Sequence, residues 1–184
     1  MIFVKTPIAG AFVIELEKRE DERGFFARAY CDNEFSAHGL STGLVQVNNS
    51  LSKRKGTVRG MHYQLAPKAE TKLVRCIRGA LFDIILDIRK GSPTFGKTFG
   101  TELSAENRKA MYVPKGFAHG FITLQDDTEA LYLVDEFYAP THERCIRWND
   151  PRFAIAWPAA MAVISDKDRD QKDFDPVWHL ETPA

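Results

Sequence analysis

The sequence predicts a mostly β protein, a sandwich or barrel of short strands with a few short helices. Many short apolar runs are separated by Gly, Pro, Asn and Asp, as in all-β folds. Within residues 82–88 the apolar side chains alternate with Asp83 and Asp87, so this segment is expected to be a half-buried strand. The expected strands cover residues 11–17, 24–30, 44–50, 57–64, 72–78, 80–89, 97–103, 110–113, 117–124, 129–138 and 145–148.

The helices are expected to be few and short. Residues 32–38 begin with Asp32 as a cap and are followed by Gly39, which is typical of a helix end. A second capped helix is expected to start within residues 165–168. The tail from residue 173 is expected to be an irregular strap that Trp178 anchors.

Length and composition indicate one domain that spans residues 1–184. The chain has 25 basic and 25 acidic residues, a balance that argues against a nucleic-acid or anionic-membrane partner. No apolar run approaches the roughly 18 residues of a membrane span, and the N-terminus does not resemble a signal peptide. Three cysteines lie far apart in the sequence, so reduced thiols and a cytoplasmic location are expected.

The stretch 59–64 is the first candidate for chemistry, with His62 as a general base. Gly60 lacks a side chain, which predicts that something approaches the backbone beside this histidine. Strand alternation places His62 and Arg59 on opposite faces, so a shared pocket requires a bulge or a strand end between them.

Four further side chains have both a structural and a functional interpretation. His119 lies between two glycines and is either a hydrogen-bonded core histidine or a ligand contact. Tyr132 and Tyr138 are six residues apart and so point to the same side of an unbroken strand, as core aromatics or as proton donor and stacking ring. Asp168 is either a solvated charge at a helix start or the group that orients His62.

A catalytic metal is not expected. The usual cluster needs two closely spaced histidines and a carboxylate, whereas Tyr63 and Gln64 follow His62, and His38, His142 and His179 are isolated. The sequence also has no glycine-rich nucleotide motif of the Rossmann or P-loop type.

Several motifs together resemble one known family, in order and over nearly the whole chain. They are Arg-Gly-Met-His-Tyr-Gln at 59–64, Lys-Leu-Val-Arg at 72–75, Asp-Ile-Arg at 87–89 with Ser-Pro-Thr-Phe-Gly at 92–96, Pro-Lys-Gly-Phe-Ala-His-Gly-Phe at 114–121, and the segments 138–143, 146–151 and 165–168. On these motifs the chain resembles the dTDP-4-dehydrorhamnose 3,5-epimerase family.

The resemblance implies a cupin-type jelly roll, a homodimer and no cofactor. It implies a nucleotide-diphosphate 4-keto-6-deoxyhexose as substrate, with inversion at C3, C5 or both through an enolate. In that family pattern His62 accepts the proton, Asp168 orients it, Tyr132 donates a proton and Tyr138 stacks near the nucleotide. The implied substrate contacts also include Arg23, Gln46, Asn48, Arg59, Lys72, His119, Glu143 and Lys167.

The chain departs from the family pattern near the nucleotide. Arg28 stands where the family usually has Glu, and Val47 replaces the Asp of a Gln-Asp-Asn stretch. The sequence therefore leaves open which nucleotide and sugar are used and whether one or both carbons invert. A mono-epimerase, a ketoisomerase that lacks the opposite-face acid, and a non-catalytic sugar-nucleotide-binding protein remain the alternatives.

Overall fold

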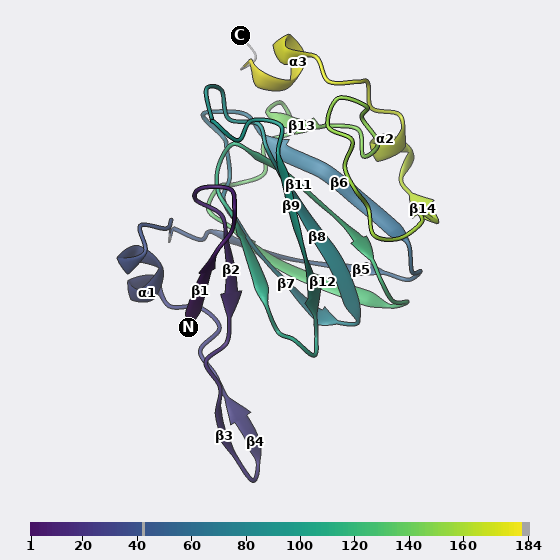
Figure 1. Ribbon diagram of the computed structural model, residues 1–184. Helices are drawn as coiled ribbons and strands as arrows, with labels where there is room; N and C mark the ends of the chain where they lie inside the picture. The colour runs from purple at the N-terminus through teal and green to yellow at the C-terminus, as the bar shows by residue number, and fades with distance from the viewer. Residues whose placement is uncertain (42, 182–184) are drawn as a thin grey trace.

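Two β-sheets pack face to face in the computed structural model, which describes residues 1–41 and 43–181 (Figure 1). The first sheet has the order β1 (Ile2–Lys5), β2 (Phe12–Glu15), β10 (Ala110–Val113), β7 (Lys72–Arg78), β12 (Thr128–Val134) and β5 (Gln46–Ser52). The second has the order β13 (Glu143–Cys145), β6 (Thr57–Gln64), β11 (Phe117–Thr123), β8 (Ala80–Asp87) and β9 (Thr98–Ser104), with β14 (Val163–Ile164) parallel to β6. The predicted mostly β sandwich with a few short helices is confirmed.

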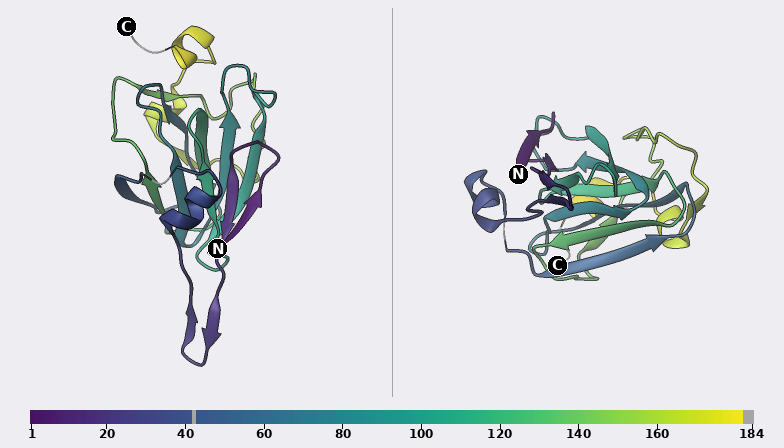
Figure 2. Two further views of the ribbon diagram at one scale, coloured as in Figure 1. Left: turned by 90° about the vertical axis from the view of Figure 1, so that its left-hand side faces the viewer. Right: turned by 90° about the horizontal axis from the view of Figure 1, so that it is seen from below.

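A small hairpin projects from the body of the sandwich. It consists of β3 (Arg19–Asp21) and β4 (Gly24–Phe26), and both Figure 1 and Figure 2 show it extending well clear of the two sheets. The aromatic rings of Phe25 and Phe26 are exposed there. The Phe25 ring lies 5.0 Å from Lys18 Nζ and 4.8 Å from the Arg108 guanidinium, whereas Phe26 is 69% exposed.

Strand β8 is buried on both faces, so the expectation of a half-buried strand was wrong. Leu81 and Ile85 face the core between the sheets, whereas Ile84 and Leu86 face an outer apolar cluster. Residues of the C-terminal third, from Ile146 onward, cover that outer cluster. The alternating aspartates are therefore fully buried instead of solvated.

Several boundaries differ from the sequence-based expectation. Strand β12 ends at Val134, so Tyr132 and Tyr138 do not share one unbroken strand. Strand β13 covers residues 143–145 instead of 145–148, and β1, β3 and β14 were not expected. Helix α1 (Asp32–Ala37) has Cys31 as its N-cap instead of Asp32. Strand alternation predicted the central strands well, because burial sets the order of their apolar and polar residues. The ends of strands and the short outer strands depend on tertiary contacts, which alternation does not reveal.

The C-terminal segment forms two short helices, α2 (Asp166–Arg169) and α3 (Pro176–Leu180). The hydroxyl of Ser165 caps α2 by accepting a hydrogen bond from the Asp168 N–H at 3.2 Å. Trp178 is 54% exposed, but it holds the tail to buried Arg144, whose guanidinium lies 4.1 Å from the ring centroid and donates to the Trp178 carbonyl at 2.9 Å. His179, which is 1% exposed, is a second anchor that the sequence did not indicate. Tyr63 fixes this end of the chain by donating its hydroxyl to the His179 carbonyl at 2.9 Å.

Within the described residues, no helix has the length and apolar character needed to cross a membrane.

Candidate active site

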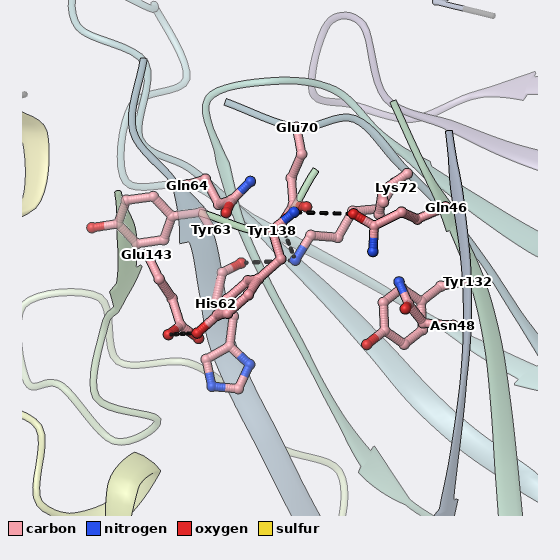
Figure 3. Close-up of a pocket in the computed structure, with 11 residues that line it drawn as sticks. Gln46, Asn48, His62, Tyr63, Gln64, Glu70, Lys72, Tyr132, Tyr138 and Glu143 are labelled. Carbon is pink, nitrogen blue, oxygen red and sulfur yellow. Dashed lines mark hydrogen bonds and ion pairs between the residues drawn. The ribbon is translucent and has the colours of Figure 1, made fainter. Parts of the chain in front are cut away.

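A cavity opens between the two sheets and is lined by polar side chains from both (Figure 3). It has two adjoining parts of about 210 Å³ and about 170 Å³. His62, Lys72 and Tyr132 line both parts, so these three side chains stand where the two parts meet. The cavity is therefore built from β6 on one side and from β7 and β12 on the other.

His62 is held by a buried carboxylate. Its Nε2 lies 2.7 Å from Oδ1 of Asp168, whose side chain is 6% exposed. Burial raises the pKa of Asp168, but the hydrogen bonds from His62 and the Gly60 N–H and the nearby positive charges outweigh it, so the net pKa is lowered. An ionised carboxylate only accepts hydrogen bonds, so in the neutral imidazole Nε2 carries the proton and Nδ1 has the free lone pair.

Tyr132 stands across the cavity from His62, on strand β12 of the other sheet (Figure 3). Burial is the main cause that raises the pKa of its phenol, and the charge of Glu70 adds to it, while Arg59 acts in the opposite direction. The phenol therefore keeps its proton at neutral pH. The cavity thus places a proton acceptor and a proton donor on its two opposite walls.

Lys72 brings a positive charge into the same space. Its Nζ lies 3.0 Å from Oε1 of Glu70 and 3.4 Å from the His62 carbonyl, and the residue is buried. A cation at this depth acts strongly on negative charge that develops beside it, because little water screens it. Glu70 was not singled out in the sequence, since its role follows from a contact with a lysine two residues away that only the fold reveals.

His119 is oriented by a second buried carboxylate, that of Asp83. Its Nε2 lies 2.8 Å from Oδ2 of Asp83, which is fully buried. The sequence pattern predicts Asp83 on the polar face of a half-buried strand, whereas the structure buries it completely. Asp83 shares one strand face with Leu81 and Ile85, which face the inter-sheet core, and this shared parity is the signal that could have placed it in the interior.

Arg59 reaches the same part of the cavity as His62 because the strand is irregular. The register of β6 against β11 shifts between His119 and Phe121, so the bulge that a shared pocket requires is present. Arg59 donates to the Ser52 hydroxyl and the Leu51 carbonyl, both at 3.2 Å.

The glycines near the two histidines allow neighbouring strands and one arginine side chain to approach the backbone closely. A Cβ at Gly60 would lie 2.5 Å from Gly120 Cα, and one at Gly120 would meet the Arg59 carbonyl at 2.7 Å. A Cβ at Gly116 would meet the Arg89 side chain. The prediction that something approaches the backbone at Gly60 is therefore confirmed, and what approaches is the neighbouring strand β11.

The mouth of the cavity carries a linked set of polar groups around an exposed ring. The Tyr138 hydroxyl donates to Glu143 at 2.8 Å, and Lys167 Nζ lies 2.7 and 2.8 Å from the two oxygens of Glu143. Gln46 accepts a hydrogen bond from the Tyr138 N–H at 3.0 Å, and Asn48 lines the adjacent wall. The Tyr138 ring is exposed, so one of its faces is available for stacking.

Arg23 is the one predicted substrate contact that the fold does not bring to this cavity. It lies at the tip of the β3–β4 hairpin, its side chain is 84% exposed, and its guanidinium pairs with Asp21. The remaining eleven predicted site residues line the cavity or contact a residue that does.

A jelly-roll cavity with a carboxylate-backed imidazole facing a protonated phenol defines an acid–base isomerase. The family model for dTDP-4-dehydrorhamnose 3,5-epimerase matches residues 5–175. A relative of that description from Sinorhizobium fredii is 47% identical over 172 residues, which cover 93% of this chain and 88% of the relative.

Solved structures agree with this match. The dTDP-4-dehydrorhamnose 3,5-epimerase from Elizabethkingia anophelis superposes with a TM-score of 0.91 at 40% identity, over 95% of this chain and 96% of that chain. The enzyme of the same description from Bacillus anthracis, with TDP and PPi bound, gives a TM-score of 0.90 at 42% identity, over 94% and 99%. The chain belongs to the dTDP-4-dehydrorhamnose 3,5-epimerase family and is an isomerase that acts on nucleotide-linked sugars.

Proposed function

We propose that this chain converts dTDP-4-dehydro-6-deoxy-D-glucose into dTDP-4-dehydro-L-rhamnose by inverting C3 and C5 in turn. The observation that carries the proposal is the pairing of His62 and Tyr132 on opposite walls of one cavity. Inversion at a carbon requires that a proton leaves one face of the sugar and another arrives on the opposite face. A base and an acid on facing walls meet that requirement. The cytoplasmic location remains a prediction from the sequence.

In the first step Nδ1 of His62 takes the proton from a carbon beside the C4 ketone. Such a hydrogen is weakly acidic because the resulting anion spreads onto the ketone oxygen. Asp168 holds the imidazole in the tautomer that exposes the Nδ1 lone pair, and it stabilises the imidazolium that forms. Lys72 and His119 stand beside the cavity where the enolate oxygen would develop its charge.

In the second step the Tyr132 hydroxyl gives its proton to the carbon from the other side. Its raised pKa keeps that proton available at neutral pH. The nucleotide would lie toward the mouth, with its base against the Tyr138 ring and its diphosphate near Arg59 and Lys167. Gln46, Asn48 and Glu143 would then supply hydrogen bonds to the substrate.

Solvent exchange tests the proposal directly. In D2O, the folded protein is expected to incorporate deuterium at both C3 and C5 of dTDP-4-dehydro-6-deoxy-D-glucose. NMR measures the incorporation at each carbon. Incorporation at one carbon alone would make the protein a mono-epimerase. Tight binding of the sugar nucleotide without exchange at either carbon would make it a binding protein instead.

Replacing Asp168 with Asn is expected to lower kcat by about 100-fold or more while KM changes little. An amide donates a hydrogen bond to Nε2, which moves the imidazole proton to Nδ1 and removes the lone pair that acts as base. Steady-state kinetics check this result. Asp166→Asn is the matched control, because that exposed carboxylate lies on the same short helix and pairs with Arg169. A rise in KM with an unchanged kcat would contradict the role of Asp168 in orienting His62.

The raised pKa of Tyr132 predicts where activity falls at alkaline pH. The phenol must be protonated to donate, and its proton is lost only above the ordinary pKa of 10.0. We therefore expect the alkaline limb of kcat to lie above pH 10 and to disappear in Tyr132→Phe. If the alkaline limb persists unchanged in that variant, the limb reports the titration of another group.

We also propose that two chains form a homodimer in which each β3–β4 hairpin reaches the cavity of the other chain. The proposal is supported by the projecting hairpin, its exposed Phe25 and Phe26, and the apolar side chains that β5 exposes at the end of its sheet. In this arrangement Arg23, which is far from its own cavity, becomes a diphosphate contact in the partner's site.

Mixing two impaired variants, assayed at a substrate concentration below the raised KM, tests that arrangement. Arg23→Ala is expected to raise KM about tenfold or more, the cost of one charge-assisted hydrogen bond to phosphate. Heterodimers of Arg23→Ala with His62→Ala should regain one intact site in two, because the arginine and the histidine come from different chains. Light scattering should give the mass of a dimer. If mixing restores nothing while heterodimers form, Arg23 does not serve the partner's site.

A further inference from the structure

A third reactive side chain lies behind the His62–Asp168 pair and has no part in the proposed mechanism. Cys145 sits directly opposite His62 in the antiparallel pairing of β13 with β6, and it is 3% exposed. Its sulfur, the facing imidazole nitrogen and an Asp168 carboxylate oxygen all lie within 4.8 Å of one another. Across residues 1–41 and 43–181, these form the one such group of three potential metal ligands.

We propose that His62, Cys145 and Asp168 form a binding site for Zn²⁺ that inhibits the enzyme. One thiolate, one imidazole and one carboxylate are a suitable ligand set for this ion, with a fourth position left for water. Tetrahedral zinc with bonds of about 2.0–2.3 Å places its ligand atoms about 3.3–3.8 Å apart. The His62 nitrogen and the Asp168 oxygen, now 2.7 Å apart, would separate slightly, and the Cys145 sulfur would approach them by about 1 Å or less.

Charge also favours zinc at this depth. The Cys145 thiolate and the Asp168 carboxylate together balance the two charges of the ion, so the filled site is neutral. The Cys145 thiol releases its proton to solvent when the ion binds. The ion and its water ligand can enter from the cavity, because the His62 side chain is 31% exposed.

Zinc at this site would remove the general base. The ion takes the Nε2 lone pair, so the proton of the neutral imidazole must sit on Nδ1, the nitrogen that otherwise accepts the substrate's proton. The groups at the mouth of the cavity stay free to bind the nucleotide. The expected inhibition therefore lowers kcat and leaves KM nearly unchanged, a consequence that rests on the proposed function.

Cobalt binding tests the site without using activity. Under reducing conditions Co²⁺ is expected to give a thiolate-to-cobalt charge-transfer band in the near ultraviolet, and Zn²⁺ should displace it. The band should persist in the double variant Cys31→Ser/Cys76→Ser, in which Cys145 is the single remaining thiol, and vanish in Cys145→Ala. Absence of the band in the wild type or the double variant overturns the proposal, as does its persistence in Cys145→Ala.

Activity then tests the consequence. Under conditions that saturate the cobalt-binding site, buffered Zn²⁺ should lower the kcat of the wild type and of the double variant at least about tenfold, and a chelator should restore it. Cys145→Ala should keep its activity in the same zinc buffer. Equal inhibition of all three proteins overturns the proposal. A wild type without activity before zinc is added contradicts the proposed function instead, and the cobalt band still reports on the site.

Discussion

Replacing His62 with Ala is expected to lower kcat for epimerisation about 10³-fold, the size of effect that one positioned general base supplies. The substitution removes the only imidazole that the fold backs with Asp168, so no other group takes the substrate's proton at neutral pH. Deuterium uptake at C3 and C5 should fall by the same factor, measured by NMR. The affinity for dTDP, measured by calorimetry, should change little because the nucleotide groups lie at the mouth.

His119→Ala is the matched control for that experiment. Both histidines line the same cavity and both pair with a buried aspartate, but His119 is assigned to the enolate oxygen. Its loss should lower kcat without abolishing deuterium uptake at either carbon. If His62→Ala exchanges deuterium as fast as the wild type, the assignment of the base is wrong.

Replacing Tyr132 with Phe should separate the two halves of the reaction. His62 still removes the proton, so exchange of substrate hydrogens with D2O continues. The proton that returns comes from the imidazole on the original face, so the carbon keeps its configuration. We expect the rate of inverted product to fall about 10²-fold or more, while exchange into unreacted substrate falls much less.

Two other outcomes of the Tyr132→Phe experiment have clear meanings. Unchanged turnover would exclude the phenol as donor and favour a ketoisomerase that needs no acid on the opposite face. Equal loss of exchange and of inversion would mean that the phenol acts before the proton leaves the carbon. Tyr138→Phe serves as the control, because that ring is assigned to stacking and keeps its face without the hydroxyl.

The sequence predicted the sandwich because its central strands alternate clearly. Strand β6 was expected at residues 57–64 and is found there, since one side of it must meet the core. Strand β8 was misjudged because alternation reveals that two faces differ but not what covers each of them. The segment from Ile146 onward covers its outer face, and that contact joins residues about 60 positions apart.

The site was predicted mainly by the family resemblance. Strand alternation alone separated Arg59 from His62, and only the register shift of β6 against β11 brings them together. The partner of His62 lies 106 residues away, so no local pattern could select Asp168 over other acidic residues. Glu70 and Asp83 were missed because each acts by holding another side chain, and such a contact has no signature in spacing.

The most direct test is a crystal structure with an unreactive dTDP-linked 6-deoxy sugar that carries a hydroxyl at C4. The account predicts His62 Nδ1 and the Tyr132 hydroxyl on opposite faces of the sugar ring, each about 3–3.5 Å from C3 or C5. A sugar bound with both side chains on the same face, or with either of them out of reach, would contradict it.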